Sequence, residues 1–332
     1  MSQKTTMPAR LFDLIQAPLR WQLLKTGFDF GLFDHLSEPA SAADVAAALG
    51  LDTRRTELVL NALCSMEFLK KDQGRYVLTP EATPYLSRSG PLSFKVTLDS
   101  LSAFRHGDIG ALLRGDASPL APPNMADPAF WARSADSLRA FHRTMAADTA
   151  LPLLETLPEW HGAHRFLDLG AGSEVLATRI LQRRPDMRLS VLDLPPMAGI
   201  IRAALGPNDD SSPAIEILSG DYNDAPLGAD YDIVWAAMTL YYAWDLVGFL
   251  SKIRDALSEK GLFISLHEGL CAERTLPESH VVGRLIPALR GQDRSFSQGE
   301  IAAALEKAGF SKVDSRTVET PFGSMQLDIG RR

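Results

Sequence analysis

The sequence predicts an α/β fold, with a mostly parallel, doubly wound sheet that ends in an antiparallel hairpin and a smaller helical domain before it. Two observations support this prediction. From residue 165 onward, short apolar segments alternate with segments of helical periodicity, as in parallel sheets covered by helices. Before that point, apolar residues mostly recur at helical spacing. We therefore expect a helical domain over 1–100, a helical linker and lid over 101–160, and a ligand-binding sheet domain over 161–332.

The composition is that of an ordinary globular protein, with 45% hydrophobic and 23% charged residues among 332. The formal net charge of −7 disfavours nucleic acid and anionic membranes as partners. The two cysteines, Cys64 and Cys271, lack metal-ligand spacing, so we expect reduced thiols and no metal site. No apolar run suits a signal peptide or a transmembrane helix, so we expect a cytoplasmic location.

The N-terminal domain carries the pattern helix, helix and β-hairpin. Ser41 can cap one short helix, and Asp52 or Thr53 can cap a second. The segment FLKKDQGRYVLT then reads as two short strands around a turn. This order is typical of a winged-helix unit. DNA binding is one interpretation, but the second helix carries only Arg54 and Arg55 as cations, so packing or dimerisation is the role that we favour.

The C-terminal domain contains five strand-like segments separated by helical ones. The five segments are RFLDLG, LSVLDL, AIEILSG, YDIVWAA and GLFISLHE. Two further segments, KVDSRTVET and GSMQLDIG, flank the dipeptide PF and predict the terminal hairpin. Together they predict a seven-stranded sheet.

The ends of the first two strands carry a nucleoside-binding pattern. Asp168 ends the first strand, and Gly170 and Gly172 allow a tight turn and a close approach of ligand to backbone before a helix N-terminus. Asp193 ends the second strand, twenty-five residues after Asp168. An acid at that place can accept hydrogen bonds from ribose hydroxyls.

The third strand and the glycine loop narrow the class of nucleoside. The segment SGDYND places Asp221 and Tyr222 at the same edge of the sheet. The loop has no lysine, and Glu174 stands where a dinucleotide fingerprint would have its third glycine. An acid is unfavourable beside a pyrophosphate but favourable opposite a sulfonium or an ammonium. S-adenosylmethionine is a nucleoside of this kind.

The sequence resembles the class I S-adenosylmethionine-dependent O-methyltransferases that carry an N-terminal winged-helix dimerisation domain. The resemblance covers nearly the whole chain. It rests on the segments FLDLGAGSE, VLDLP, GDYNDAPL, AFHRTMAADT and GQDRSFSQGEIAAALEKAGF. It implies a Rossmann-like methyltransferase sheet, an S-adenosylmethionine cofactor, a small-molecule substrate and a homodimer formed through the N-terminal domain.

The resemblance also implies roles for single residues. Asp193 would bind ribose, Asp221 with Tyr222 would frame adenine, Met145 would pack near the sulfonium and Thr149 would bond the carboxylate. The full set of implied cofactor-binding residues is Asp168, Gly170, Gly172, Glu174, Asp193, Leu194, Asp221, Tyr222, Met145 and Thr149. The loop departs from the family pattern because Ala171 replaces the middle glycine and Glu174 the last.

The segment TLYYAWD falls on the family motif L-H-x-W-x-D, whose histidine takes the proton from the substrate hydroxyl. Tyr241 or Tyr242 occupies the histidine position, depending on the alignment. A tyrosine, with a pKa near 10, is a poor proton acceptor at pH 7. The acid that supports the family histidine corresponds to Asp293, and His267 stands at the neighbouring strand end.

Three interpretations of the missing histidine stay open. In the one that we favour, the acceptor is a thioether sulfur that needs no base, as in the methylthiohydroxybutyrate S-methyltransferases of dimethylsulfoniopropionate synthesis, and catalysis reduces to positioning. In the second, His267 serves as the base of an O- or N-methyltransferase. In the third, the fold performs a reaction other than methyl transfer. A winged-helix regulator that senses the nucleoside is the alternative that is not an enzyme.

The substrate pocket is expected to contain cations. Arg284 stands where the family has an apolar residue, typically methionine, and Arg290 follows nearby. An arginine there predicts a carboxylate on the substrate, with a surface salt bridge as the alternative. Phe141 and His142, on the helix that closes over the cofactor, complete the expected substrate-binding residues.

Overall fold

The computed structural model describes residues 6–88, 90, 92–105, 107–115, 127–206 and 215–332. The chain forms two compact units, Met1–Leu98 and Asp99–Arg332. The second unit includes the segment that we expected to be a linker and lid. No helix of the described ranges is long and apolar enough to cross a membrane.

The first unit contains the predicted helices and hairpin. Its elements are α1 (Met7–Phe30), η1 (Leu32–His35), β1 (Ala40–Ser41), α2 (Ala42–Leu49), α3 (Thr53–Ser65), β2 (Leu69–Asp72), β3 (Arg75–Leu78) and α4 (Thr83–Leu86), and α5 (Lys95–Arg105) begins at its end. Ser41 caps α2 in a capping box with Asp44, and the Asp52 side chain accepts a hydrogen bond from the Arg55 N–H to cap α3. β3 pairs antiparallel with both β1 and β2.

The second unit contains the predicted seven-stranded sheet. Its strands are β4 (Arg165–Leu169), β5 (Arg188–Asp193), β6 (Ile215–Ser219), β7 (Tyr231–Ala237), β8 (Leu257–His267), β11 (Lys312–Thr320) and β12 (Gly323–Arg331). They lie in the order β11-β12-β8-β7-β4-β5-β6. Strands β4 to β8 pair in parallel, and β12 and β11 add antiparallel neighbours at one side. The α/β fold and its terminal hairpin are thereby confirmed.

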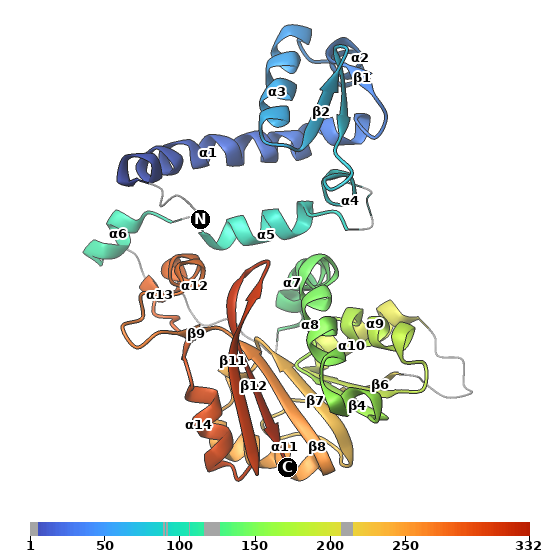
Figure 1. Ribbon diagram of the computed structural model, residues 1–332, viewed down its shortest axis with the longest axis vertical. Coiled ribbons are helices and arrows are strands. Elements are labelled where there is room, and N and C mark those ends of the chain that lie inside the picture. Colours follow the sequence, from blue (N-terminus) through green and yellow to red (C-terminus); the bar gives the residue numbers. More distant parts are fainter. Residues whose placement is uncertain (1–5, 89, 91, 106, 116–126, 207–214) are drawn as a thin grey trace. The chain divides into compact units, whose positions relative to one another are not determined.

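Helices cover both faces of this sheet (Figure 1). One face packs against α7 (Pro128–Phe141), α8 (Ala147–Glu155), α9 (Val175–Arg183) and α10 (Pro195–Leu205). The opposite face packs against α11 (Leu246–Ala256) and α14 (Glu300–Lys307). The remaining short elements are α6 (Ile109–Arg114), η3 (Pro158–His161), η4 (Leu240–Tyr242), β9 (Gly269–Leu270), α12 (Glu278–Gly283), α13 (Leu285–Leu289) and β10 (Phe296–Ser297).

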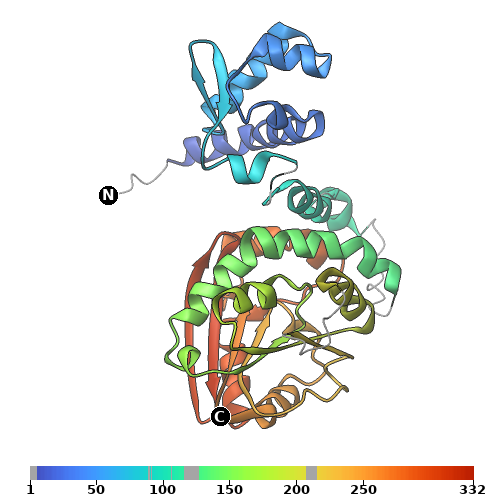
Figure 2. The same ribbon diagram turned by 90° about the vertical axis from the view of Figure 1, so that its right-hand side faces the viewer.

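A turn of π-helix joins α7 to α8. This turn, η2 (His142–Ala146), continues both helices into the long rod that Figure 2 shows across the second unit. Such wide turns are rare in proteins and are frequently found at functional sites. The sequence pattern predicted a helix here but gave no sign of the widened turn.

The strand order defines where a ligand can bind. β4 lies between β5 and β7, so the chain leaves β4 toward one side of the sheet and later returns to the other. In open α/β sheets, ligands bind at this switch point, outside the carboxyl ends of the strands. The loops after β4, β5, β6, β7 and β8 all lie at that edge. The small parallel pair β9-β10, which the sequence did not predict, lies just after the end of β8.

Candidate functional site

The loop after β4 is shaped by its two glycines. Gly170 and Gly172 have φ angles of 66° and 64°, in the left-handed region that glycine adopts readily. A Cβ atom at Gly170 would collide with the Thr239 side chain, and one at Gly172 would lie 3.1 Å from Cε1 of His142. The loop therefore runs close to the chain on both sides, and a larger residue at Gly170 would displace it.

Asp193 fixes this loop from the end of the neighbouring strand. Its Oδ2 accepts a hydrogen bond of 2.8 Å from the Gly172 N–H, and its Oδ1 accepts one of 2.7 Å from the Leu194 N–H. Burial nevertheless raises the pKa of Asp193 to about 6. Burial, followed by the charge of Asp193, also raises the pKa of Asp168 well above its usual range. Two desolvated carboxyl groups thus stand together at the carboxyl edge of the sheet.

The loop after β6 contributes Asp221 but not the Tyr222 side chain. Asp221 Oδ1 accepts hydrogen bonds of 2.9 and 2.8 Å from the backbone and side-chain nitrogens of Asn223. The Tyr222 ring stacks on Phe249 at 4.6 Å, and its hydroxyl donates to the Thr239 carbonyl at 2.7 Å. Packing in the core therefore occupies the Tyr222 ring, and the expectation that Tyr222 frames adenine together with Asp221 stays a prediction.

Glu174, the departure from the glycine pattern, is paired with a cation of α7. Its Oε1 lies 2.8 Å from Nε of Arg139, and both side chains are largely buried. Its Oε2 is buried and has no hydrogen-bond partner among the described residues. The sequence suggested that this acid faces the cofactor's cation. Arg139 already balances its charge, which leaves only Oε2 for a further donor.

The helical rod contributes the other expected lid residues. His142 Nδ1 and Ser173 Oγ lie 2.7 Å apart, which ties η2 to the glycine loop. Burial lowers the pKa of His142 to about 4, so its ring is neutral at pH 7. Met145 is buried, and the Thr149 hydroxyl donates to the Met145 carbonyl within the helix at 2.9 Å. Phe141 packs on Phe322 with ring centroids 5.2 Å apart.

His267, at the end of β8, is held in hydrogen bonds with the loop that follows β7. It is fully buried, and its Nε2 accepts the backbone N–H groups of Thr239 and Leu240, each at 3.0 Å. An Nε2 that accepts has no proton, so Nδ1 carries it and donates to Ser265 Oγ at 2.8 Å. Burial, and next the charge of Arg284, lower the His267 pKa to about 3. In this geometry neither ring nitrogen is free to take a substrate proton.

Tyr241 takes the place beside His267. Its ring stacks on Phe296 at 5.2 Å and meets the His267 ring edge-on at 5.2 Å. Its hydroxyl is buried and has no hydrogen-bond partner among the described residues. Tyr242, in contrast, is 40% exposed, with the Arg294 guanidinium 4.9 Å from its ring centroid. Tyr241 is therefore the tyrosine that lines the interior of the edge.

Arg284 does not offer an uncompensated positive charge to a substrate. It forms an ion pair with Glu268, a carboxylate that is only 2% exposed, and its guanidinium lies 4.8 Å from the Tyr241 ring centroid. The expectation of a substrate carboxylate at Arg284 thus loses its basis, because Glu268 already supplies the anion. Glu268 directly follows His267 in the sequence, and no local sequence pattern marks its pairing with Arg284.

Two more of the expected site residues lie elsewhere or play other parts. Asp293 is half exposed and pairs with Arg274 at 2.8 Å, and no contact joins it to Tyr241 or His267 in the described chain. Arg290 has a buried Nε without a hydrogen-bond partner among the described residues. The described residues also include no group of three or more His, Cys, Asp or Glu side chains that could hold a metal ion.

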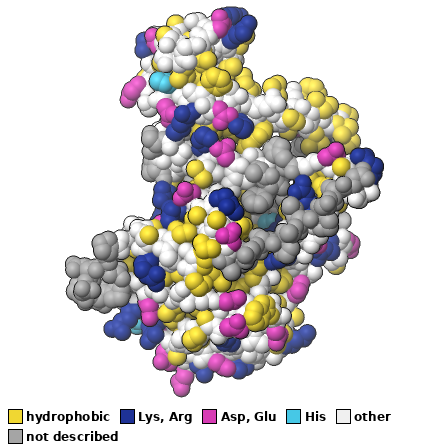
Figure 3. Space-filling model, turned by 180° about the vertical axis from the view of Figure 1, so that it is seen from behind, with side chains coloured by type: hydrophobic (Ala, Val, Ile, Leu, Met, Phe, Trp, Pro, Cys, Tyr) yellow, Lys and Arg dark blue, Asp and Glu magenta, His cyan; other side chains and the backbone are white. Residues whose placement is uncertain are grey.

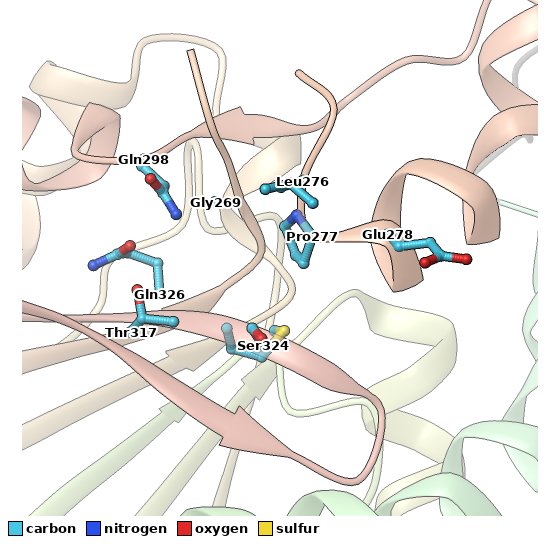
Figure 4. Close-up of a pocket in the computed structure, with 9 residues that line it drawn as sticks. Gly269, Leu276, Pro277, Glu278, Gln298, Thr317, Ser324 and Gln326 are labelled. Atoms are coloured by element: carbon cyan, nitrogen blue, oxygen red, sulfur yellow. The ribbon is translucent and has the colours of Figure 1, made fainter. Parts of the chain in front are cut away.

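A separate cavity of about 300 Å³ lies beside β9 and the terminal hairpin. Figure 4 shows Gln298, Gln326 and Thr317 on one side of it and Leu276 and Pro277 on another. None of the residues expected at the site lines this cavity. One of the residues that line it is Gly269, which follows Glu268 in the chain.

Comparison with known families gives two matches that together span most of the chain. The family described as "O-methyltransferase dimerisation domain" matches residues 12–88. The family described as "O-methyltransferase domain" matches residues 127–311, which is more than half of the chain.

Comparison with individual proteins gives relatives of similar length. Demethylspheroidene O-methyltransferase of Rhodobacter capsulatus is 24% identical over 97% of this chain and 81% of its own. The N,N-dimethyltransferase OxyT of Streptomyces rimosus is 25% identical over 94% of this chain and 93% of its own. The solved structure of human N-acetylserotonin methyltransferase in complex with S-adenosylmethionine superposes with a TM-score of 0.71 at 19% identity, covering 100% of this chain and 99% of that one.

Proposed function

Because this chain belongs to the O-methyltransferase family, we propose that it methylates a small molecule by holding donor and acceptor in line, without a histidine that removes the acceptor's proton. The protein is an S-adenosylmethionine-dependent methyltransferase. When bound, S-adenosylmethionine supplies a methyl group made electrophilic by its sulfonium sulfur. The proposal concerns the residues that hold each reactant and the atom that accepts the methyl group.

The loops after β4, β5 and β6 suit the cofactor. The desolvated Asp193 carboxylate can accept hydrogen bonds from ribose hydroxyls, which would compensate the cost that burial imposes on its ionised form. The tight turns at Gly170 and Gly172 leave the backbone open to a close neighbour, and the free Oε2 of Glu174 can accept from an ammonium group. We propose these residues, with Asp168, Leu194, Asp221, Met145 and Thr149, as the cofactor site.

The proposal about the acceptor depends on one observation. Tyr241, one of the two tyrosines that align with the family histidine, lies beside His267, and His267 has both ring nitrogens in hydrogen bonds. An acceptor that attacks through a lone pair without losing a proton suits such a site. A thioether sulfur is that kind of acceptor: its lone pair forms the new S–C bond, the donor S–C bond breaks, and the positive charge passes to the product sulfonium. The residues then act by positioning and by excluding water.

A hydroxyl or amine acceptor is the second candidate. Relatives named for transfer to oxygen and to nitrogen favour it. Such an acceptor must release a proton, and the buried Glu268 carboxylate next to Arg284 is the anion that this edge offers to receive it. The two candidates make opposite predictions about which acceptors turn over.

An acceptor panel separates the two candidates. Purified protein with S-adenosylmethionine is offered 3-(methylthio)propan-1-ol and 3-(methylthio)propylamine as thioethers, and catechol and 2-aminophenol as phenols. Methylated products are identified by mass spectrometry. We expect sulfonium products from the thioethers. Turnover confined to the phenols would replace the thioether proposal with the second candidate, and no binding of S-adenosylhomocysteine by calorimetry would contradict the cofactor site itself.

We also propose that the protein works as a homodimer joined through its N-terminal unit, which matches the dimerisation family. Hydrophobic side chains gather on the exposed surface of α1 (Figure 3). Leu11, Leu14 and Ile15 are 54%, 68% and 74% exposed in the single chain, which is unfavourable unless a partner covers them. Light scattering should give the mass of a dimer for the wild type, and Leu14→Asp combined with Ile15→Asp should give a monomer. A monomeric wild type would contradict this proposal.

A further inference from the structure

Unsatisfied polar atoms gather at the acceptor side of the edge. The Tyr241 hydroxyl and the Glu268 carboxylate are buried, and the hydroxyl and Oε2 of Glu268 have no hydrogen-bond partner among the described residues. The Oε1 of Glu268 contacts Arg284 in the ion pair. Buried polar groups in folded proteins almost always have a partner, and leaving one without a partner costs about 1–3 kcal/mol. A missing partner is therefore expected here.

These atoms belong to one contiguous wall built from distant parts of the chain. Arg284, at the end of α12, touches Glu268 after β8 and covers the Tyr241 ring in η4. Phe296 of β10 stacks on the same tyrosine, because β10 pairs with β9 directly after Glu268. The wall thus combines an aromatic surface with a carboxylate and a hydroxyl.

The atoms of this wall that have no described partner favour a ligand that donates hydrogen bonds. The Arg284 charge is balanced by Glu268, so the pair is close to neutral as a whole. The free Oε2 of Glu268 can only accept a hydrogen bond, and the Tyr241 hydroxyl can both accept and donate. An incoming O–H or N–H group would satisfy both atoms. An incoming carboxylate would instead face the negative charge of Glu268 in a buried place.

We infer that the methyl acceptor carries a hydroxyl or amino group, separate from the methylated atom, that binds between Glu268 and Tyr241. This inference rests on the proposed function only in placing the acceptor on this side of the edge. It replaces the carboxylate expected on the substrate with a hydrogen-bond donor.

Matched compounds test the inference by binding, independently of turnover. One series is 3-(methylthio)propan-1-ol, 3-(methylthio)propylamine, 3-(methylthio)propanoate and 1-(methylthio)butane, and the other is catechol, 2-aminophenol, salicylate and 2-methylphenol. Calorimetry with protein saturated with S-adenosylhomocysteine gives each affinity. In at least one series, the hydroxyl and amino members should bind at least about tenfold more tightly than the methyl and carboxylate members, since the hydrogen bond is to a charged group.

Three variants locate the effect. Glu268→Gln should bring the affinity of the amino member to within about threefold of that of the methyl member, because the variant lacks the negative charge. The hydroxyl member should lose less affinity, because it is neutral and the amide oxygen still accepts its hydrogen bond. Tyr241→Phe should lower the affinity of the donor members by about fivefold and leave that of the methyl member unchanged. Glu273→Gln, the same exchange at an exposed residue of this region, should change nothing. Melting temperatures report whether each variant is folded. If Glu268→Gln does not fold, Tyr241→Phe still tests the inference.

Two results would overturn the inference. One is tighter binding of the carboxylate members to the wild type together with its loss in Arg284→Met, which would identify Arg284 as a receptor for an acid. The other is the absence of any donor preference in both series, including no measurable binding of the donor members. If thioethers are methylated but no donor preference is found, the proposed function stands and the inference fails. If a donor preference is found but only phenols turn over, the inference stands and the thioether proposal fails.

Discussion

The two halves of the sheet's carboxyl edge are built in different ways. In the half proposed for the cofactor, after β4, β5 and β6, the polar groups lie within a few residues of their strands, and backbone N–H groups of the adjacent loops hold Asp193, although Glu174 also pairs with Arg139 of α7. In the acceptor half, after β7 and β8, the wall requires Arg284 and Phe296 from later parts of the chain. We therefore expect the half proposed for the cofactor to keep its ligand when the other half changes. The acceptor half can therefore vary its chemistry while the cofactor half stays the same.

The largest expected effect comes from His267, which we assign to the framework of the acceptor half. His267→Ala removes the acceptor of two buried N–H groups, at Thr239 and Leu240, and should lower the free energy of unfolding by about 4 kcal/mol. The melting temperature should fall by about 10 °C, measured by calorimetry. His267→Gln, whose amide oxygen can accept, should recover part of the loss. A variant with unchanged stability and no activity would instead indicate a catalytic base.

Asp193 tests the independence of the cofactor half. Asp193→Ala removes a buried carboxylate that also holds the Gly172 N–H, so the affinity for S-adenosylhomocysteine should fall by about 30- to 100-fold in calorimetry. Asp193→Asn keeps one oxygen acceptor and should lose less. Tyr241→Phe, the matched change in the acceptor half, should keep the wild-type affinity for this ligand within about twofold. A large loss in Tyr241→Phe would show that the halves are coupled.

Asn223 joins the two halves and tests how rigid that connection is. Its side chain donates to Asp221 at 2.8 Å and to the Tyr242 carbonyl at 3.1 Å, and it accepts from the Trp244 N–H at 3.0 Å. Asn223→Ala should lower kcat/KM for the best acceptor of the two series by about fivefold, with less than about threefold change in affinity for S-adenosylhomocysteine. An equal loss in both measurements would assign Asn223 to the cofactor half alone.

The smallest expected effect is that of pH on turnover. His267, with a pKa of about 3, stays neutral from pH 5 to 9, so kcat for a thioether should change less than about twofold between pH 7 and 9. Below about pH 6 the Asp193 carboxyl binds a proton in the free protein. In the proposed cofactor site, ribose hydroxyls would donate to its ionised form, so cofactor affinity should fall as pH falls through that value. A steep rise of kcat with pH would reveal a titrating base or acceptor.

The two halves also differ in how far the sequence predicts them. Strand periodicity and the acids at strand ends located the sheet and the places of Asp168, Asp193 and Asp221, because these signals are local. The packing of the Tyr222 ring on Phe249 was not predicted, since the sequence pattern of a loop tyrosine is the same whether its ring packs in the core or faces a ligand. The Glu268–Arg284 pair joins residues sixteen positions apart across a strand end and a helix, and no periodic pattern marks such a contact.

The role of Arg284 also depends on a contact between distant residues, which the sequence pattern does not show. An arginine in a pocket-lining helix predicts an anion nearby, and an anion is present, but the chain itself supplies it. Burial of Glu268 decides between the two readings, and burial depends on strands β7 to β10 packing together. Likewise, the sequence placed His267 correctly at the strand end but could not show that two backbone amides occupy its Nε2.

The π-turn at His142–Ala146 has a consequence for how this fold tolerates insertions and deletions. A π-turn holds one more residue than the α-helical turn in its place. Removing one residue there would restore a continuous α-helix and leave α7 and α8 close to their present relative orientation. Arg139 would then still face Glu174, and α7 would keep its place over the glycine loop. Of all positions in the rod, this is where a single-codon deletion should be best tolerated, because a deletion within α7 or α8 would rotate one part of the rod by about 100° relative to the other.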